Sequence, residues 1–414
     1  MPARVLLLLP TTTYRTPDFM KAATSLGVEV VVASERPTTM EKVNPSGLLT
    51  LDFHDPGESA RKAAAFHQTT PFQAVIPVDD DTAVVAAAIA EAVGILHNSP
   101  ESAEAARNKL RMRELLDRAG LRVPGFTLFP LDEEPSAGAW IKLRYPSVVK
   151  PLFLSASRGV IRADNPGEIR AALGRIALLL SDPELAARGG PLARRALVED
   201  FVPGREFALE GILTRGELRV LALFDKPDPL DGPLFEETIY VTPSRLPPKV
   251  QAEIAGTAAR AASALGLREG PVHAELRVND GGVWLIEMAA RSIGGLCSRT
   301  LRFGAAISLE ELILRHALGM DVGEFECEPH PSGVMMIPIP MRGILEQVRG
   351  KEEAAGVPGI EDVVITAHLG KKLVPLPEAA SYLGFIFARA ETPEAVERAL
   401  REAHRRLELV VRSD

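Results

Sequence analysis

Two glutamates on a predicted β-hairpin are candidate ligands for a metal ion. The segments 273–278 and 283–288 alternate apolar and polar residues on either side of a short turn. Matching the apolar face of the first strand to Trp284, Ile286 and Met288 of the second places Glu275 opposite Glu287. Two facing carboxylates at roughly 5 Å and an effective dielectric constant of about 20 repel by about 3 kcal/mol. A bound cation would offset this repulsion.

The chemistry of these side chains indicates which cation would bind. Ligands that offer only oxygen suit Mg²⁺ or Mn²⁺, which proteins usually share with substrate phosphates. The predicted register requires an odd-length loop with a left-handed glycine, because a two-residue turn would send the glutamates to opposite faces. As an alternative, Arg277 and Arg291 on the same face neutralise the pair as a surface ion network.

Two lysines are candidates for binding phosphate. Lys150 ends a short apolar strand, and the segment 152–159 that follows is rich in small residues that let backbone N–H groups approach an anion. Lys109 is predicted at the start of a helix, where a cation is unfavourable to the helix dipole, and this favours a role in binding a ligand. The alternative for Lys150 is a lysine that extends to solvent from the strand end.

An acidic strand and an acidic run complete the candidate groups. Glu199, Val202 and Glu206 could contact the amino group, the ring edge and the ribose hydroxyls of a nucleotide, or they could belong to an edge strand with solvated acids. The run 79–81 consists of three aspartates, which could supply an outer acidic contact. Acids that stabilise the N-terminus of a helix are the simpler explanation of that run.

The elements that must position these residues alternate between strand and helix at the N-terminus. Apolar runs predict strands at 5–9, 28–32, 74–78 and 94–95, with helices at 17–26 and 82–93 between them. This alternation predicts a doubly wound α/β domain over residues 1–98. The first turn lacks the G-x-G-x-x-G fingerprint of dinucleotide-binding proteins.

After residue 98 the predicted secondary structure no longer alternates regularly between strand and helix. A helix at 99–120 is followed by a region rich in antiparallel strands, with predicted strands at 148–150, 196–202, 205–213 and 219–224 and helices at 250–265 and 309–318. Beyond a proline-containing linker at 329–331, strands near 334–339, 363–367 and 382–388 precede a final helix with Thr392 as N-cap. The predicted domains after residue 98 are 99–328, with a lid subdomain at about 125–203, and an α+β domain at 329–414.

Composition excludes several classes of function. The chain has 414 residues, a net charge of −8 and two cysteines, and no basic block stands out. Nucleic acid is therefore a poor partner, and neither a disulfide framework nor a cysteine metal site is expected. The apolar run near the N-terminus is too short for a signal peptide or a membrane span. A cytoplasmic protein without a membrane partner is expected.

The candidate lysines, the small-residue loop, the acidic strand and the charged hairpin occur in an order that resembles the ATP-grasp superfamily. Lys109 with its helix resembles the first-lysine helix of the family, and YPSVVKPLFLSASRGV resembles its second lysine and phosphate loop. LVEDFVPGREF resembles the adenine hinge, and HAELRVNDGGVWLIEMAARSIGG resembles the metal-binding carboxylates and the catalytic arginine. The C-terminal part is most similar to the L-amino-acid ligase branch, with biotin-carboxylase-like enzymes next.

The resemblance implies a role for each matched residue. Lys109 and Lys150 would contact ATP phosphates, and the loop that includes Leu154, Ala156, Ser157 and Gly159 would close over them. Glu199, Asp200, Phe201 and Val202 would hold adenine, and Glu206 would hold the ribose. Glu275 and Glu287 would bind Mg²⁺ or Mn²⁺. Arg291 would bind the substrate carboxylate and stabilise the reaction intermediates, with Gly294 nearby, and Glu237 and Tyr240 would face the amine substrate.

The implied function is a ligase that joins a carboxylate to an amine. ATP would activate the carboxylate as an acyl phosphate, and small carboxylates and amines, amino acids above all, would be the substrates. Ala289 stands where the family often has asparagine, and Tyr240 stands where histidine is common. The alternatives are a bicarbonate-activating enzyme like biotin carboxylase and a nucleotide-binding regulator without turnover. A homodimer is expected because dimers are common among such enzymes.

Overall fold

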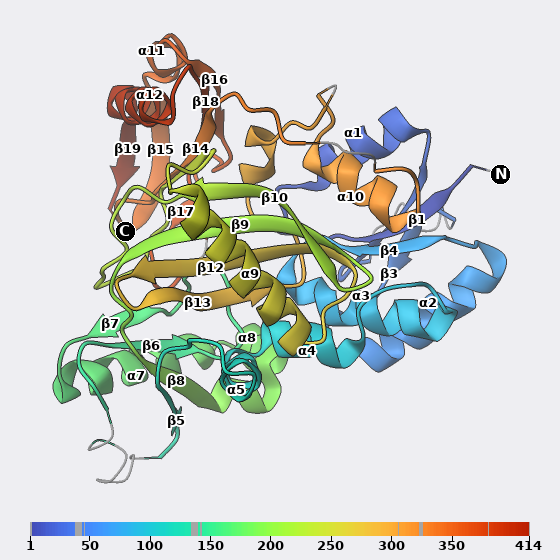
Figure 1. Ribbon diagram of the computed structural model, residues 1–414, viewed down its shortest axis with the longest axis horizontal. Coiled ribbons are helices and arrows are strands. Elements are labelled where there is room, and N and C mark those ends of the chain that lie inside the picture. Colours follow the sequence, from blue (N-terminus) through green and yellow to red (C-terminus); the bar gives the residue numbers. More distant parts are fainter. Residues whose placement is uncertain are drawn as a thin grey trace.

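A four-stranded parallel sheet forms the N-terminal part of the protein (Figure 1). The computed structural model describes residues 2–37, 44, 46–133, 140, 143–304, 306–322, 326–379 and 381–413. The strand order is β3-β2-β1-β4. The elements are β1 (Arg4–Leu8), α1 (Thr16–Leu26), β2 (Glu29–Ser34), β3 (Leu48–Thr50), α2 (Pro56–Thr69), β4 (Ala74–Pro77) and α3 (Asp80–Val93).

Helices cover both faces of this sheet, which confirms the predicted doubly wound arrangement. Val5 and Leu7 of β1 pack with α1 and with α10 (Leu309–Ala317), which returns from far along the chain. Leu6 and Leu8 pack on the other face with α2 and α3. The continuous apolar run of β1 is therefore explained, because each of its alternating faces is buried.

Two predicted elements near residue 100 differ from the structure. Gly94 is the left-handed C-cap of α3, with φ of 73°, and the strand predicted at 94–95 is absent from these described residues. The helix predicted at 99–120 is two helices, α4 (Pro100–Arg107) and α5 (Lys109–Arg118). Asn108 separates them because its side chain accepts a hydrogen bond from the backbone N–H of Arg111 at 3.2 Å and caps α5.

A second, antiparallel sheet forms the part that we call the lid, residues 126–200. Its strand order is β5-β8-β6-β7. The elements are β5 (Phe126–Pro130), β6 (Ser147–Pro151), β7 (Ile161–Ala163), α7 (Pro166–Leu180), α8 (Pro183–Gly189) and β8 (Arg195–Asp200). Helix α7 packs its apolar face on this sheet through Ile169, Leu173 and Ile176.

An eight-stranded sheet joins the middle of the chain to the C-terminal part. Its order is β13-β12-β9-β10-β11-β14-β18-β16. Its strands are β9 (Arg205–Thr214), β10 (Glu217–Asp225), β11 (Ile239–Thr242), β12 (Gly270–Asn279), β13 (Gly282–Ala289), β14 (Ser332–Ile337), β16 (Ile360–Ile365) and β18 (Gly384–Arg389). Because β11 pairs with β14, hydrogen bonding continues across the predicted boundary at residue 329. The domain boundaries remain predictions.

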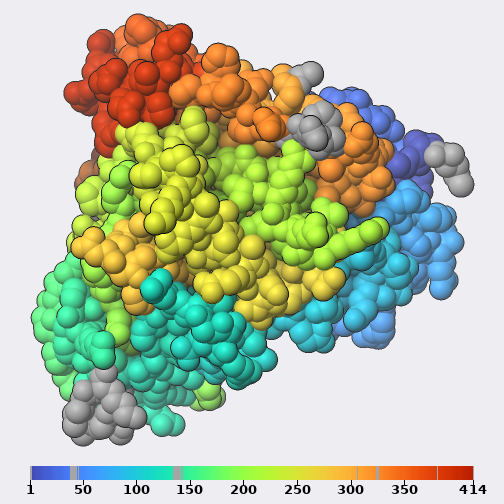
Figure 2. Space-filling model, viewed as in Figure 1, coloured from blue at the N-terminus to red at the C-terminus, as the bar shows by residue number. Residues whose placement is uncertain are grey.

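The remaining elements cover this sheet. Helix α9 (Pro248–Ala264) packs on the half that holds β12 and β13, and α12 (Pro393–Arg406) packs on the half that holds β14 and β18. The C-terminal part also contains α11 (Lys351–Ala355) and a small sheet of β15 (Gly343–Arg349), β17 (Lys372–Leu373) and β19 (Glu408–Arg412). Helices α11 and α12 and the lid lie at opposite ends of the view in Figure 2. None of the helices in the described ranges is long and apolar enough to cross a membrane.

The charged hairpin reaches its predicted pairing by a different register. A two-residue turn joins β12 and β13, and Leu276 lies opposite Leu285 rather than Ile286. A β-bulge then shifts the register by one residue, so Glu275 still lies opposite Glu287. The opposed glutamates are confirmed, but the predicted odd-length loop is wrong. Val283, Leu285, Met288 and Ala289 are buried in the second strand, whereas the predicted core residues Trp284 and Ile286 are only partly buried.

Candidate functional site

A cavity of about 320 Å³ lies between the N-terminal sheet, the lid and the eight-stranded sheet. Its walls come from the first βα turn, the start of α3, the loop after β6 and the strands β9, β11, β12 and β13. The predicted site residues that line it are Lys109, Lys150, Leu154, Ala156, Ser157, Glu199, Asp200, Phe201, Val202, Glu206, Glu237, Tyr240, Glu275, Glu287, Arg291 and Gly294. Gly159 is not among the lining residues.

Lys150 and Glu199 form a buried ion pair in the wall of this cavity. They lie on the neighbouring strands β6 and β8, and Lys150 Nζ lies 2.5 Å from Glu199 Oε2. Arg113 of α5 donates from Nε to the other carboxylate oxygen at 2.7 Å. Burial alone would raise the pKa of Glu199, but the two cations lower it below its ordinary value. Burial also lowers the pKa of Lys150, against the opposing effect of Glu199.

The break between α4 and α5 directs Lys109 into the cavity. The backbone N–H of Lys109 donates to the carbonyl of Leu152 at 2.9 Å, and its ammonium donates to the carbonyl of Leu154 at 2.8 Å. The same ammonium lies 3.0 Å from a carboxylate oxygen of Glu287. Lys109 therefore connects the loop after β6 to the charged hairpin.

The loop after β6 has an uncommon backbone conformation. Ala156 and Ser157 both have positive φ, 53° and 54°, a region that L-residues adopt at a cost of about 1–2 kcal/mol each. Gly159 also has positive φ, and a Cβ there would lie 2.7 Å from Pro151. Its backbone N–H donates to the carbonyl of Pro377 at 2.8 Å. Gly159 thus shapes the loop from outside the cavity.

The segment after β8 is held by its own protein partners. The backbone N–H of Asp200 donates to the carbonyl of Gly125 at 2.8 Å, and the guanidinium groups of Arg162 and Arg277 lie 4.7 and 5.1 Å from the ring centre of Phe201. Arg277 also donates to the carbonyl of Val202 at 2.8 Å. The segment after β8 is therefore held in place on the side that faces β12.

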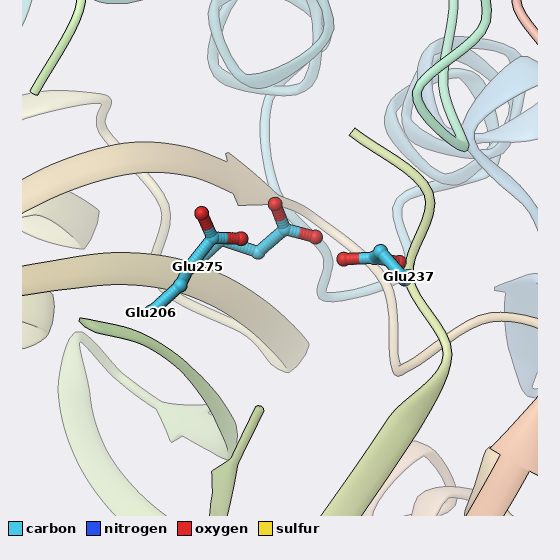
Figure 3. A group of neighbouring side chains, drawn as sticks. All are labelled: Glu206, Glu237 and Glu275. Carbon is cyan, nitrogen blue, oxygen red and sulfur yellow. The ribbon is translucent and has the colours of Figure 1, made fainter. Parts of the chain in front are cut away.

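Three carboxylates converge near the middle of the cavity wall. Glu206 lies on β9, Glu275 lies on β12, and Glu237 lies in the segment before β11. One carboxylate oxygen of each lies within 4.8 Å of those of the other two (Figure 3). Lys226, directly after β10, places its ammonium among them, 2.8 Å from Glu206 and 3.6 Å from Glu275, and it also bonds Glu237. Glu287 is not part of this group.

The predicted metal ligands therefore have separate protein partners. Glu287 contacts Lys109, whereas Glu275 lies near Lys226 and 3.8 Å from His273. Both glutamates line the cavity, and their carboxylates are the hard oxygen donors that suit Mg²⁺ or Mn²⁺. Ala289 is buried and offers no ligand atom beside them.

Arg291 is held by one of the three N-terminal aspartates. Its Nη2 donates to Asp80 Oδ2 at 2.7 Å, and its Nη1 donates to the carbonyl of Ser292 at 2.9 Å. Burial would lower the pKa of Arg291, but the Asp80 carboxylate raises it overall. The acidic run thus begins α3 and also lines the cavity, where Asp80 pairs with Arg291.

The predicted substrate residues surround the other end of the cavity. The hydroxyl of Tyr240 donates to Glu237 at 2.8 Å, and Gly294 has open space where a side chain would stand. Tyr14 and Tyr382 line the same end. Burial raises the pKa of Glu237 above its ordinary value, with Glu275 adding to the rise and Lys226 opposing it.

Sequence reasoning missed Lys226 and Arg15, and it did not identify the partners that Arg113 and Asp80 have in this site. Arg113, Lys226 and Asp80 each bond a predicted site residue, and Arg15 lines the cavity while pairing with Glu310 at 2.9 Å. The only sequence signal for Lys226 is a lysine directly after the apolar strand β10, the pattern that drew attention to Lys150. Arg15 and Asp80 lie in an N-terminal part whose orientation toward the hairpin no local pattern reveals.

Comparison with known proteins agrees with this architecture. Residues 143–300 match the ATP-grasp domain, residues 20–95 match the ATP-grasp N-terminal domain, and residues 335–412 match the L-amino acid ligase C-terminal domain 2. The solved L-amino acid ligase from Bacillus licheniformis is 25% identical, with a TM-score of 0.79 over 99% of both chains.

Curated relatives match over part of their length. Alanine–anticapsin ligase from Bacillus subtilis is 25% identical over 54% of this chain and 49% of its own length. Carnosine synthase 1 from Gallus gallus is 28% identical over 58% of this chain and 27% of its own length. The chain thus spans half or less of these two relatives. The three matched domains, in the order expected, and the likeness over the whole solved structure show that the chain belongs to the ATP-grasp superfamily, in its L-amino-acid ligase branch.

Proposed function

We propose that this protein is an ATP-dependent carboxylate–amine ligase. The observation that carries the proposal is one cavity that combines two lysines, two opposed glutamates and an arginine: Lys109, Lys150, Glu275, Glu287 and Arg291. The names of the relatives support amino acids as substrates, since an L-amino acid ligase and an alanine–anticapsin ligase are among them.

The nucleotide would occupy the end of the cavity under the lid. Lys109 and Lys150 would bind its phosphates, with Ala156 and Ser157 closing over them and Leu154 beside them. Glu199, Asp200, Phe201 and Val202 would hold the adenine, largely through backbone groups, and Glu206 would hold the ribose. Magnesium, when bound by Glu275 and Glu287, supplies positive charge that offsets the charge of the phosphates.

The carboxylate substrate would bind beside the phosphates. Arg291 would hold it by charge-assisted hydrogen bonds, for which Asp80 keeps the guanidinium in place. A carboxylate oxygen attacks the γ-phosphorus, the bond to the β-phosphate oxygen breaks, and ADP leaves an acyl phosphate behind. The residues act by position and charge, without a nucleophilic side chain of their own.

The amine substrate would bind at the end formed by Glu237, Tyr240 and Gly294. Its nitrogen attacks the acyl carbon, the bond between carbon and the phosphate oxygen breaks, and an amide and phosphate result. The loop that includes Gly159 would keep water away from the acyl phosphate during this step. The expected homodimer and the expected cytoplasmic location remain predictions.

A screen of ADP release over pairs of amino acids and simple carboxylates tests this proposal. We expect release to require both a carboxylate and an amine, and hydroxylamine in place of the amine to give a hydroxamate. Bicarbonate-dependent release that is indifferent to amino acids would instead favour a carboxylase. Tight ATP binding without ADP release for any pair would favour a regulator, in line with Ala289.

The variant Glu287→Gln should abolish ADP release while leaving the fold intact. The amide keeps the shape of the side chain but removes the charge that would bind magnesium and that pairs with Lys109 at 3.0 Å. Turnover with saturating Mg²⁺ and ATP, compared with wild type and with the exposed control Glu217→Gln, measures the effect. Near-normal turnover of Glu287→Gln would contradict the proposed metal site.

A further inference from the structure

Lys226 is a buried lysine that lies behind the cavity wall and contacts residues that form the wall. It follows β10, its side chain is 3% exposed, and it is not among the residues that line the cavity. Its ammonium contacts Glu206 at 2.8 Å, Glu275 at 3.6 Å and Glu237, all of which do line the cavity. It also lies 5.0 Å from the ring centre of Tyr240. One side chain therefore contacts four wall residues.

The Lys226 ammonium lies where a divalent cation bound by the three carboxylates would lie. Three ionised carboxylates whose oxygens lie within 4.8 Å of one another repel, and a cation among them offsets that repulsion (Figure 3). A lysine ammonium offers three donors, and here it is the cation at the centre.

The three carboxylates depend on Lys226 to different degrees. Glu206 also accepts from Arg277 at 2.8 Å, and Glu275 also lies 3.8 Å from His273. The other partners of Glu237 carry no positive charge: they are the hydroxyl of Tyr240 at 2.8 Å and the carboxyl group of Glu275, so Lys226 is its one cationic contact among the residues that the structure describes. Removing Lys226 should therefore affect Glu237 most.

We propose that Lys226 is a positioning residue, a built-in substitute for a metal ion that holds Glu237 toward the amine-binding end of the cavity. The assignment of the amine to that end rests on the proposed ligase function. The position of Lys226 between Glu206 and Glu237 links the wall of the nucleotide end to the wall of the amine end. Its removal would free Glu237 to turn away or to bind a metal in place of the ammonium.

The first test measures Mn²⁺ binding to the nucleotide-free protein. In Lys226→Ala the three carboxylates lose their central cation, and we expect Mn²⁺ to bind at least about tenfold more tightly than to wild type. The added Glu237→Gln substitution should reverse the gain, and Lys249→Ala, at an exposed lysine at the start of α9, should match wild type. Unchanged Mn²⁺ affinity in folded Lys226→Ala would overturn the proposal.

A double-mutant cycle on stability covers the case in which single variants fold poorly. Lys226→Met removes the one cation beside the buried carboxyl group of Glu237, so Lys226→Met/Glu237→Gln should melt at a higher temperature than Lys226→Met. Additive effects of the two substitutions would overturn the coupling. If only the double variant folds, the coupling is supported.

Kinetics then separate this inference from the proposed function. In Lys226→Ala we expect KM for the amine to rise about 10- to 100-fold and KM for ATP to rise less, with partial recovery in Lys226→Arg. Equal changes in both KM values would overturn the role in positioning Glu237. Failure of wild type to release ADP with any substrate pair would overturn the ligase instead, and that result is independent of the Mn²⁺ and stability measurements.

Discussion

At the scale of single residues, every predicted cation in the cavity already has a carboxylate partner. Lys109 pairs with Glu287, Lys150 with Glu199 and Arg291 with Asp80. The sequence identified all three cations, but it predicted none of these three pairings. Strand parity could place Glu275 opposite Glu287 because both lie on one hairpin. The partnership of Arg291 with Asp80 joins positions 211 residues apart, which no local pattern encodes.

The buried group of Glu199, Lys150 and Arg113 leads to a prediction about stability. Glu199→Gln leaves two buried cations without their shared carboxylate, and breaking such a pair costs about 3–5 kcal/mol. Urea denaturation at pH 7 measures the free energy of unfolding. The exposed control Glu217→Gln should change it by less than about 0.5 kcal/mol. Equal effects of the two substitutions would contradict the structural role.

The same group should give stability a pH dependence. The pKa of Glu199 is lower in the folded protein than its ordinary value of 4.5, so the folded state binds fewer protons than the unfolded state in the window below that value. The stability that Glu199 contributes is therefore fully present above about pH 4.5 and is lost as the pH falls through the folded pKa. The difference between wild type and Glu199→Gln should shrink in that window. A constant difference from pH 7 down to pH 3 would argue against the lowered pKa.

At the scale of elements, residue patterns predicted where the hairpin and the loop after β6 lie, but they did not predict the backbone geometry of either. Alternation predicted the two strands and the pairing of Glu275 with Glu287, but it could not detect a bulge that offsets an even turn. Small residues predicted a loop at 154–159, but the positive φ of Ala156 and Ser157 depends on packing around it. The helix start predicted at Lys109 is confirmed, but the single helix predicted at 99–120 did not allow for the break at Asn108, although asparagine is a common N-cap.

The backbone of this loop predicts how substitutions at Ala156 act. A β-branched side chain is strained at φ of 53°, so Ala156→Val should weaken binding of ATP by about tenfold, which corresponds to about 1.4 kcal/mol. Ala156→Gly tolerates this conformation and should keep the affinity of wild type. Titration calorimetry with a non-hydrolysable ATP analogue provides the comparison. If valine and glycine bind the analogue equally well, the loop conformation is not required for binding.

The lid is connected to the C-terminal part through Glu378. Arg175 donates to its carboxylate at 2.5 and 3.1 Å, and Arg158 donates to its backbone carbonyl at 2.7 Å. Because Arg175 and Glu378 are partly exposed, Glu378→Ala should lower global stability by less than about 1 kcal/mol. It should still speed hydrogen exchange of the backbone at 155–162, because the carbonyl groups of residues 377 and 378, which accept from Gly159 and Arg158, lose the carboxylate that ties their segment to α7.

Hydrogen exchange followed by mass spectrometry measures this effect in the nucleotide-free protein. Glu402→Ala on α12 removes another partly exposed acid that pairs with arginine and should leave exchange at 155–162 unchanged. Unaltered exchange of that segment in Glu378→Ala would show that Glu378 does not hold the lid.

At the scale of the whole molecule, the cavity is assembled from segments that are distant in sequence. The first βα turn, α3, the lid, the eight-stranded sheet and the segment around Tyr382 all supply lining residues. The sequence predicted the α/β and α+β classes and the order of the motifs, because strand rhythm and motif order are local. It could not predict that α10 completes the N-terminal core, or that β11 joins β14, because those contacts depend on tertiary packing.

The central claim is that ATP activates a carboxylate as an acyl phosphate inside this cavity. The most direct measurement uses a carboxylate substrate labelled with ¹⁸O in both oxygens, together with the amine that supports ADP release. The attacking oxygen moves to phosphorus and leaves with phosphate, so one ¹⁸O should appear in inorganic phosphate for each amide formed. Amide formation with unlabelled phosphate, or ADP release without any amide, would contradict the account.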